Sequence, residues 1–215
     1  MDLNTALAAP DVRRADSTSV VASQWYVPDR PHVLGELRKI AARWQAGPLP
    51  EGLLSLSCWL SDTDDTALTW AQFSDLERFR RTADRSDDIP LSVVRGVEYQ
   101  LARSVVLDDE KREPGCVVIA VFDVDGAERQ RRTVETVGDA LERGRESLPG
   151  MLSANFHASV DGSRVLNYAE WTSAEAHAAF MDSPGRADVY QASSSLPGVR
   201  PIGYRRYRLY RSVHC

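Results

Sequence analysis

The feature that most constrains the fold of this chain is a similarity between its two halves. The stretch that begins at Gly52 can be laid on the stretch that begins at Gly150 without a gap, and the order of apolar runs agrees on both sides of this window. Such internal similarity is typical of one structural unit used twice, so we predict two homologous halves. The matched residues are Gly52 with Gly150, Leu54 with Leu152, Ser55 with Ser153, Ser61 with Ser159, Leu68 with Leu166, Ala71 with Ala169 and Glu77 with Glu175.

The second half has the clearer pattern of strands and helices. Its apolar runs favour strands, and apolar residues at helical spacing behind charged faces favour helices. The dipeptide Asp161–Gly162 between two alternating runs predicts a hairpin. The predicted order is a strand over Cys116–Val124, a helix over Glu128–Ser147, hairpin strands over Met151–Val160 and Ser163–Trp171, a helix over Ser173–Met181, an irregular stretch to Pro201 and a last strand over Tyr204–Val213.

The first half repeats this order. Its predicted elements are a strand over Val20–Val27, a helix over Pro31–Ala46, strands over Leu53–Leu60 and Ala67–Phe73, a helix over Ser74–Asp84 and a strand over Val97–Val106. Both halves therefore have the predicted order β-α-β-β-α-β, which is the order of the ferredoxin-like unit. The fold class that we predict is α+β, with two tandem ferredoxin-like units.

The arrangement of the two units follows from burial. A four-stranded antiparallel sheet with both helices on one face leaves its other face to be covered. We therefore expect the two antiparallel sheets to pack face to face as an internal pseudo-dimer, like a dimeric α/β-barrel, with a homodimer of whole chains left open. The predicted domains are a flexible N-terminal arm over 1–17, a first repeat over 18–107 and a second over 115–215, joined by the charged stretch Asp108–Pro114.

Composition narrows the classes of partner. The 26 basic and 31 acidic side chains give a net charge of −5, and the basic residues are scattered, so neither nucleic acid nor a membrane surface is expected as a partner. No window approaches 18 uninterrupted apolar residues and no basic leader precedes an apolar run, so we expect a cytoplasmic protein. Cys58, Cys116 and Cys215 form no C-x-x-C pair, and we expect reduced thiols.

Several short motifs in the second half occur together in one known family. They are LPG at Leu148–Gly150, HAS-x-DG at His157–Gly162, V-x-NYA-x-W at Val165–Trp171 and SSLPG at Ser194–Gly198. With these motifs the segment Pro149–Phe180 resembles the antibiotic biosynthesis monooxygenase family, most closely its small cofactor-independent members that turn anthrone- or phenol-type aromatic polyketides into quinones. The first half looks like a diverged, structural copy, in which Thr69 and Phe73 replace Asn167 and Trp171. The resemblance therefore implies that the active site belongs to the second half.

The residues of the predicted hairpin agree with this placement. The side-chain period of a strand is two, so Asn167, Ala169 and Trp171 lie on one face. Across the hairpin we expect Asn155 and His157 to share that face. An Asn carboxamide and an indole N–H can hold the oxygens of a polyhydroxylated ring system, which makes Asn167 and Trp171 the candidate catalytic pair. The structural alternative is that the Trp is core and the Asn a local cap.

The polar ends of the implied pocket depart from the family pattern. His177 stands where the closest relatives carry a Tyr, and Tyr190 stands near the place of an Arg, with Arg186 a few residues earlier. His177 could act as a base that deprotonates a phenol, or could lie on the solvent side of its helix. His157 is a second candidate base. We expect His157, His177, Tyr190, Arg186 and Asn155 to bind substrate.

The chemistry implied by the resemblance needs no cofactor beyond molecular oxygen as co-substrate. An electron-rich phenolate or carbanion supplies the electrons, while the protein holds the anion and excludes water. The chain has no dinucleotide fingerprint, no H-E-x-x-H helix and no metal cluster that we can place, so we expect neither cofactor nor metal. Three alternatives stay open: an aromatic polyketide cyclase, a haem-degrading monooxygenase, which the position of Met181 disfavours, and a non-catalytic ligand-binding protein.

Overall fold

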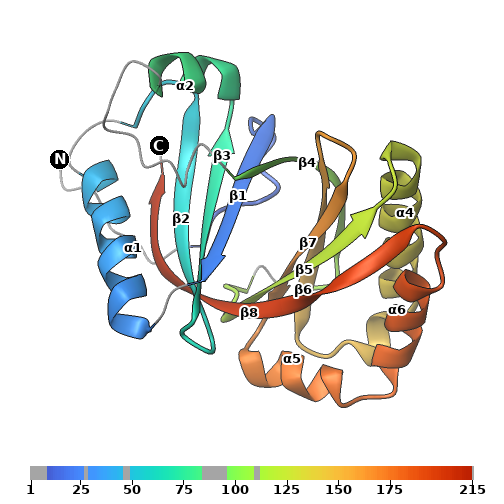
Figure 1. Cartoon of the computed structure of the whole chain (residues 1–215). Helices are drawn as coiled ribbons and strands as arrows, with labels where there is room; N and C mark the ends of the chain where they lie inside the picture. Colours follow the sequence, from blue (N-terminus) through green and yellow to red (C-terminus); the bar gives the residue numbers. More distant parts are fainter. Residues whose placement is uncertain (1–8, 27–28, 46–48, 84–95, 109–111, 215) are drawn as a thin grey trace. The chain divides into compact units, whose positions relative to one another are not determined.

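The protein divides into two compact units (Figure 1). The computed structural model describes residues 9–26, 29–45, 49–83, 96–108 and 112–214. Unit 1 consists of Met1–Tyr99 and Tyr207–Cys215, and unit 2 of Gln100–Arg206. Strands β4 (Val97–Val106) and β8 (Val199–His214) each begin in one unit and end in the other.

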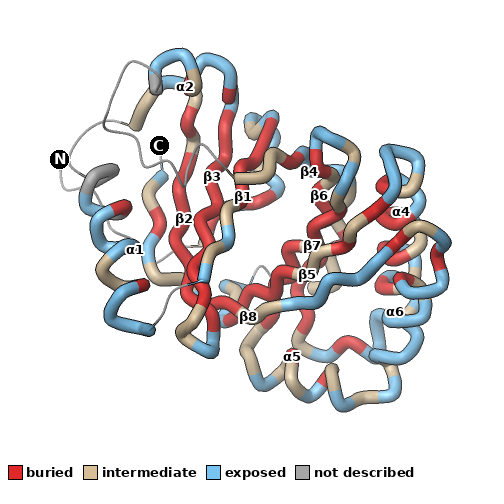
Figure 2. Tube along the Cα trace, in the orientation of Figure 1, coloured by how far each residue is buried: buried red, intermediate tan, exposed pale blue. Residues whose placement is uncertain are grey.

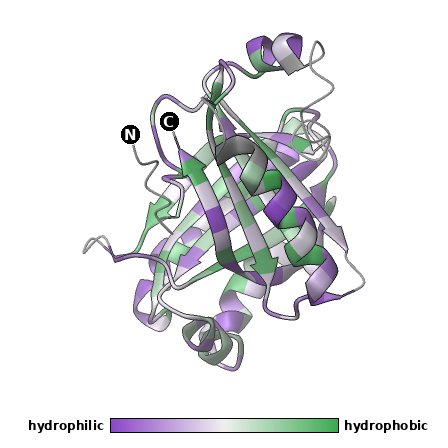
Figure 3. Cartoon of the chain, turned by 90° about the vertical axis from the view of Figure 1, so that its left-hand side faces the viewer, coloured by the Kyte–Doolittle hydropathy of each residue, from purple (hydrophilic) through white to green (hydrophobic). Residues whose placement is uncertain are grey.

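Unit 1 is an antiparallel sheet with helices. Hydrogen-bonded neighbours follow the order β4-β1-β3-β2-β8, in which β4 and β8 contribute the segments that belong to this unit. Figure 3 looks onto the helix side of this unit and shows α1 lying across the sheet. Val33, Leu37 and Ile40 of α1 are buried in one apolar cluster with β-strand residues. The remaining elements are β1 (Ser19–Tyr26), α1 (Arg30–Gln45), β2 (Leu53–Ser61), β3 (Thr66–Phe73) and α2 (Leu76–Ala83).

Unit 2 repeats this plan and, among the described residues, has one α-helix more. Its sheet order is β8-β5-β7-β6-β4. Val134, Val137 and Leu141 recur at helical spacing on α4 and are buried against the sheet, so the strands and the inner helix faces form the core (Figure 2). The elements are β5 (Cys116–Val124), α4 (Ala127–Arg143), a 3-10 turn (Arg145–Ser147), β6 (Met151–Ser159), β7 (Arg164–Trp171), α5 (Ala174–Met181) and α6 (Gly185–Ser194).

The order of strands and helices agrees with the α+β, ferredoxin-like class predicted from the sequence, with one difference. The stretch expected to be irregular between residue 182 and Pro201 contains α6. Pro184 stands at its N-cap, and proline is favoured at a helix start because its missing N–H would have no partner there. The Gly and Ser residues therefore flank this helix instead of excluding it. The face-to-face packing of the sheets concerns the placement of the units and stays a prediction.

Two predicted segments differ in detail from expectation. In the N-terminal stretch, Val12 is 3% exposed and the Gln72 Nε2 donates to the Asp11 carbonyl over 2.9 Å, so this described part packs onto β3 and is not a loose arm. Residues 1–8, and residues 109–111 of the predicted linker, lie outside the described residues. The boundary between the two compact units falls within β4 and within β8. A boundary between the two repeats at the linker stays a prediction.

Two smaller findings bear on sequence expectations. Cys58 and Cys116 are free and buried, and burial raises the pKa of the Cys58 thiol to about 12. Cys215 lies outside the described residues. Within the described residues, no helix combines the length and apolar character needed to cross a membrane.

The aligned glycines Gly52 and Gly150 occupy equivalent turns before the two hairpins. Their φ angles are +87° and +85°. Each carbonyl accepts a backbone N–H from the end of the hairpin, from Ser74 over 2.9 Å and from Thr172 over 2.8 Å. In both hairpins the strand register shifts at the second residue after the glycine. The sequence match therefore corresponds to matching backbone geometry, while a common origin of the halves stays a prediction.

We expect Gly150→Ala to lower the free energy of unfolding by about 1–3 kcal/mol. A Cβ there would lie 2.7 Å from the Ala176 Cβ and 2.8 Å from the Thr172 Oγ1, in addition to the cost of positive φ. Gly126→Ala is the matched control, because its φ is +95° but nothing lies within 4 Å of the added carbon. Urea denaturation of both variants measures the difference. Equal losses would contradict the steric argument.

Candidate active site

The pairing of β7 with its neighbours defines the face on which the candidate site lies. On β5, Ala120 is opposite Asn167, and Val118 is opposite Ala169. Residues directly opposite one another in an antiparallel pair point to the same face. Asn167, Ala169 and Trp171 therefore share one face with Val118 and Ala120. This face is covered by α4, α5 and α6, whose residues line the same cavity.

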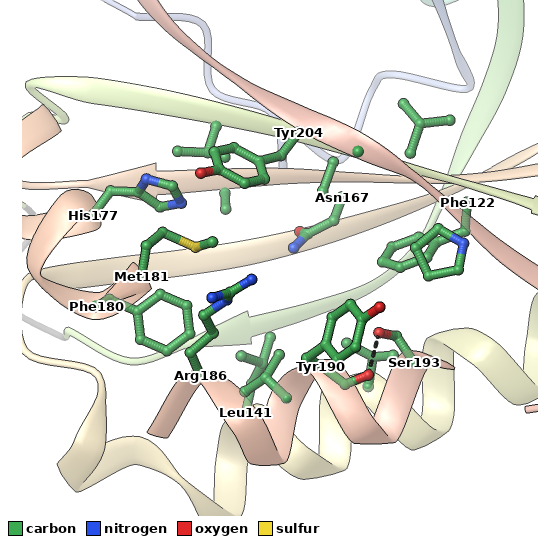
Figure 4. A pocket seen from close by; sticks show the side chains of 18 of the residues that line it. Phe122, Leu141, Asn167, His177, Phe180, Met181, Arg186, Tyr190, Ser193 and Tyr204 are labelled. Carbon is green, nitrogen blue, oxygen red and sulfur yellow. Dashed lines mark hydrogen bonds between the residues drawn. The ribbon is translucent and has the colours of Figure 1, made fainter. Parts of the chain in front are cut away.

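A cavity of about 350 Å³ lies between this sheet face and the helices (Figure 4). Its volume is within the range of small-molecule sites. The small side chain of Ala169 leaves space between Asn167 and Trp171. Apolar and aromatic residues form most of the lining, among them Phe122, Val137, Leu141, Met151, Phe180, Met181 and Val189.

Asn167 is the polar group at the centre of the sheet wall. Its side chain points into the cavity in Figure 4. The Oδ1 atom is buried and has no hydrogen-bond partner within the described part of the chain. An amide group in this state can accept a hydrogen bond from a ligand through Oδ1 and can donate through Nδ2.

One end of the cavity is aromatic. Trp171 is 2% exposed, and its ring centroid lies 5.0 Å from that of His177 with an angle of 83° between the planes. Tyr204 of β8 contacts His177 in the same edge-on manner at 5.1 Å. His177 is 4% exposed, so it lies in the cavity wall and not on the solvent side of α5. Tyr204 has no counterpart among the residues expected from the sequence.

The mouth of the cavity is formed by α6 and the start of β8. Arg186, Tyr190 and Ser193 follow one another at helical spacing, so they lie on the same side of α6, toward the cavity. Tyr190 and Ile202 are each 57% exposed. The Ser193 hydroxyl donates to the Tyr190 carbonyl over 2.9 Å (Figure 4). The structure thus brings together Asn167, Trp171, His177, Arg186 and Tyr190 as expected from the sequence.

Asn155 and His157 lie on the other face of the sheet, which corrects their predicted place in this pocket. Asn155 is opposite Tyr168 and His157 is opposite Leu166, so both point away from the face of Asn167. Asn155 is fully buried in a polar network on that face. Its Nδ2 donates to Ser153 Oγ over 2.8 Å and to the Tyr168 carbonyl over 3.1 Å, and its Oδ1 accepts from the Ser104 hydroxyl over 2.8 Å.

His157 is fully buried beside this network. Its Nδ1 lies 3.0 Å from the Asn155 carbonyl oxygen. Burial disfavours the charged ring and lowers the pKa of His157 from 6.5 to about 4, against a smaller opposite effect of that carbonyl. The ring is therefore neutral at pH 7 and belongs to the packing of the sheet.

This shift makes stability depend on pH. Because the pKa is lower in the folded state, the unfolded chain binds a proton between pH 6.5 and 4 that the folded chain rejects. The contribution of His157 to the free energy of unfolding is fully present above that pH window. It is lost as pH falls through the window, by on the order of 3 kcal/mol. We expect His157→Gln to flatten the fall in unfolding free energy between about pH 7 and pH 4.5.

The control for this measurement is His32→Gln, because the His32 side chain is 68% exposed. Contributions from the carboxyl groups are common to all three proteins and cancel in the comparison. Urea titrations across the pH range measure the slopes. Parallel slopes for the unaltered protein and His157→Gln would show that the ring does not reject its proton.

Metal ligands do not gather at the cavity. Among residues 9–26, 29–45, 49–83, 96–108 and 112–214, no three His, Cys, Asp or Glu side chains are grouped so that they could hold an ion. The polar groups of the cavity are instead an amide, an indole, an imidazole, a guanidinium, phenols and the Ser193 hydroxyl. Such groups can orient an oxygen-rich aromatic ligand and exchange protons with it.

The fold and the cavity define a ferredoxin-like α+β protein with a cavity of small-molecule size under its helices. A model of the family described as "Antibiotic biosynthesis monooxygenase" matches residues 115–192, and the chain belongs to this family. Tetracenomycin-F1 monooxygenase from Streptomyces glaucescens is 32% identical over 85 residues, which are 40% of this chain and 75% of that protein. The match to the family model falls on the half that carries Asn167 and Trp171.

Several solved structures are similar to this chain in fold. The crystal structure of an anthrone oxidase-like protein has a TM-score of 0.71 at 15% identity and covers 93% of this chain and 94% of that chain. A structure described as a major regulator of staphylococcal pathogenesis has a TM-score of 0.50 at 14% identity, over 89% of this chain and 98% of that chain. At these identities the likeness shows the fold alone.

Proposed function

We propose that this protein is a monooxygenase of polyketide biosynthesis that oxidises an anthrone- or phenol-type aromatic intermediate to a quinone with molecular oxygen. The observation that carries the proposal is the Asn167 carboxamide, which points into an apolar cavity beside Trp171 and whose Oδ1 has no protein partner within the described part of the chain. Family membership and the similarity to tetracenomycin-F1 monooxygenase support it.

The proposed reaction balances without a further reductant. For an anthrone, one ring CH₂ and one O₂ give one carbonyl and one water. Loss of a proton produces the carbanion or phenolate, which transfers one electron to oxygen. The resulting radical and superoxide combine to form a C–O bond, and the peroxide takes up a proton. Loss of the second C–H proton then breaks the O–O bond and releases water.

The cavity residues have separate parts in this proposal. Asn167 Nδ2 and the Trp171 indole N–H donate to the oxyanion that develops on the substrate. His177, beside Trp171, takes the first proton, since a neutral imidazole suits proton removal near pH 7. The apolar lining keeps out bulk water, which strengthens both hydrogen bonds.

Removing either donor should lower turnover while the fold stays intact. We expect Asn167→Ala and Trp171→Phe each to reduce the rate of oxygen uptake with an anthrone substrate by about 10²-fold. Trp171→Phe keeps an aromatic ring and removes the N–H, so it separates hydrogen bonding from packing. The measurement is oxygen consumption together with quinone absorbance and thermal melts.

The first half of the chain supplies matched controls. Thr69 and Phe73 occupy the positions that correspond to Asn167 and Trp171, and both are buried in unit 1. Thr69→Ala and Phe73→Leu should change stability more than rate. Normal rates in the unit 2 variants, with loss of activity in Phe73→Leu at unchanged stability, would move the site to unit 1. Product formation without oxygen uptake would indicate a cyclase, and no turnover at all a binding protein.

We also propose that the reaction proceeds without a resident cofactor. Oxygen uptake should be unchanged after exhaustive dialysis against a chelator, because the substrate supplies the electrons. The same preparation should show no visible absorbance from flavin or haem. Loss of uptake on chelation, with recovery on adding back one metal ion, would contradict this proposal.

A further inference from the structure

A second cavity lies on another side of α6 from the cavity of Asn167. It has a volume of about 420 Å³ and is formed by α4, α6 and the turn that follows α4. Asp188, Ala192 and Ser195 follow one another at helical spacing, so they share one side of α6 and face this cavity. Tyr190 points from the same helix into the cavity of Asn167 (Figure 4). Helix α6 therefore separates two cavities, and we call the second one the α4–α6 groove.

Helices α4 and α6 lie side by side and run antiparallel along this groove (Figure 1). At one end, a Cβ added at Gly185 would lie 3.0 Å from the Ser147 Cβ, so α6 begins beside the turn that follows α4. At the other end, the Arg129 Nε donates to the Pro197 carbonyl over 2.9 Å, which joins the first turn of α4 to the loop after α6. The last turn of α4 and the first turn of α6 therefore lie at the same end of the groove.

Two opposite charges stand on the two walls at this end. Arg143 is in the last turn of α4 and Asp188 is in the first turn of α6, where each charge complements the dipole of its helix. Among the described residues, they are the only charged ones that line the groove. Neither forms an ion pair or a side-chain hydrogen bond within the described part of the chain, whereas Arg131 of the same helix lies 3.0 Å from Glu135. The groove thus presents a cation and an anion that do not neutralise each other.

The rest of the lining is mostly small and polar. The hydroxyl groups of Thr136, Ser147 and Ser195 and the amide of Gln191 can donate and accept hydrogen bonds. Within the described residues, no aromatic side chain lines the groove, so a flat aromatic ligand has no ring to stack on. The volume is within the range of small-molecule sites. The lining therefore favours a small hydrophilic molecule that carries both charges.

We propose that the α4–α6 groove is a second binding site, which takes a zwitterion of amino-acid or dipeptide size. The carboxylate of the ligand accepts two parallel hydrogen bonds from the Arg143 guanidinium, and its ammonium group donates to the Asp188 carboxylate. Both side chains are exposed, so the ligand stays partly hydrated and avoids most of the cost of burying charge. The site is independent of the proposed oxidation, because neither residue has a part in that reaction.

The test measures binding of alanine and of the dipeptide alanyl-alanine at about pH 6, where the amino and carboxyl groups of both are charged. NMR titration of isotope-labelled protein reports both the affinity and the place of binding. We expect saturable binding of at least one of the two, with amide signals of α4 and α6 shifting. The N-acetylated form lacks the ammonium group and the amidated form lacks the carboxylate, so each should bind about tenfold more weakly or less.

Variants of the two charged residues assign the contacts. Arg143→Gln and Asp188→Asn should each weaken binding of the zwitterion by about tenfold or more. Asp188→Asn should leave the weak binding of the N-acetylated form unchanged, and Arg143→Gln that of the amidated form. Arg132→Gln and Glu128→Gln are the matched controls, because both residues are exposed on α4 outside the groove lining, and they should leave every affinity unchanged.

Several results would overturn the inference. No saturable binding of either zwitterion would refute it. Equal binding of the zwitterion and its N-acetylated form would show a site for anions instead. Unchanged affinity in both Arg143→Gln and Asp188→Asn would place the ligand elsewhere on the protein. A mass of two chains in solution that Asp188→Asn restores to one chain would show that a second copy occupies the groove. None of these measurements requires turnover, so a failure of the proposed oxidation leaves their outcome unaffected.

Discussion

Strand β7 is paired on both edges, with β5 on one side and β6 on the other, and this pairing determines what each of its side chains can reach. Asn167, Ala169 and Trp171 face the helices and the cavity, while Tyr168 and Glu170 face the opposite side of the sheet. A slip of one residue would exchange these two sets and place a carboxylate and a phenol under the helices. The position of the candidate donors is therefore fixed by backbone hydrogen bonds and not by side-chain packing alone.

The register of β7 is held at both ends of its hairpin. At the turn, the Asp161 Oδ1 accepts from the Ser159 hydroxyl over 2.7 Å and from the Ser163 N–H over 3.0 Å. These hydrogen bonds lower the pKa of Asp161 to about 2, so the carboxylate stays ionised. The Gln130 side chain of α4 donates to the carbonyls of Ser159 and Arg164, each over 2.8 Å. At the other end, the Ser153 hydroxyl donates to Glu170 over 2.6 Å, so a slip would leave a buried carboxylate without that partner.

The sequence predicts the strands and the face of Asn167, because alternation and the Asp161–Gly162 turn are local signals. The sequence also contains the information that places Asn155 on the other face of the sheet. A two-residue turn at Asp161–Gly162 puts Val160 opposite Ser163, and counting back puts Asn155 opposite Tyr168. Two features had no such signal. Helix α6 buries only Ser193, so its sequence has no apolar residues repeated at helical spacing. Tyr204 contacts His177 only because β8 lies beside β5 in the folded sheet.

The two walls of the cavity consequently differ in how firmly they are held. The sheet wall carries Asn167 and Trp171 on a strand paired along both edges. The opposite wall at the mouth is α6, which packs on α4 and places Val189 against the core, and whose only buried residue is Ser193. Substitutions on α6 can change which ligand is accepted without disturbing the donors on β7, because the two sets of residues share no hydrogen bonds within the described part of the chain.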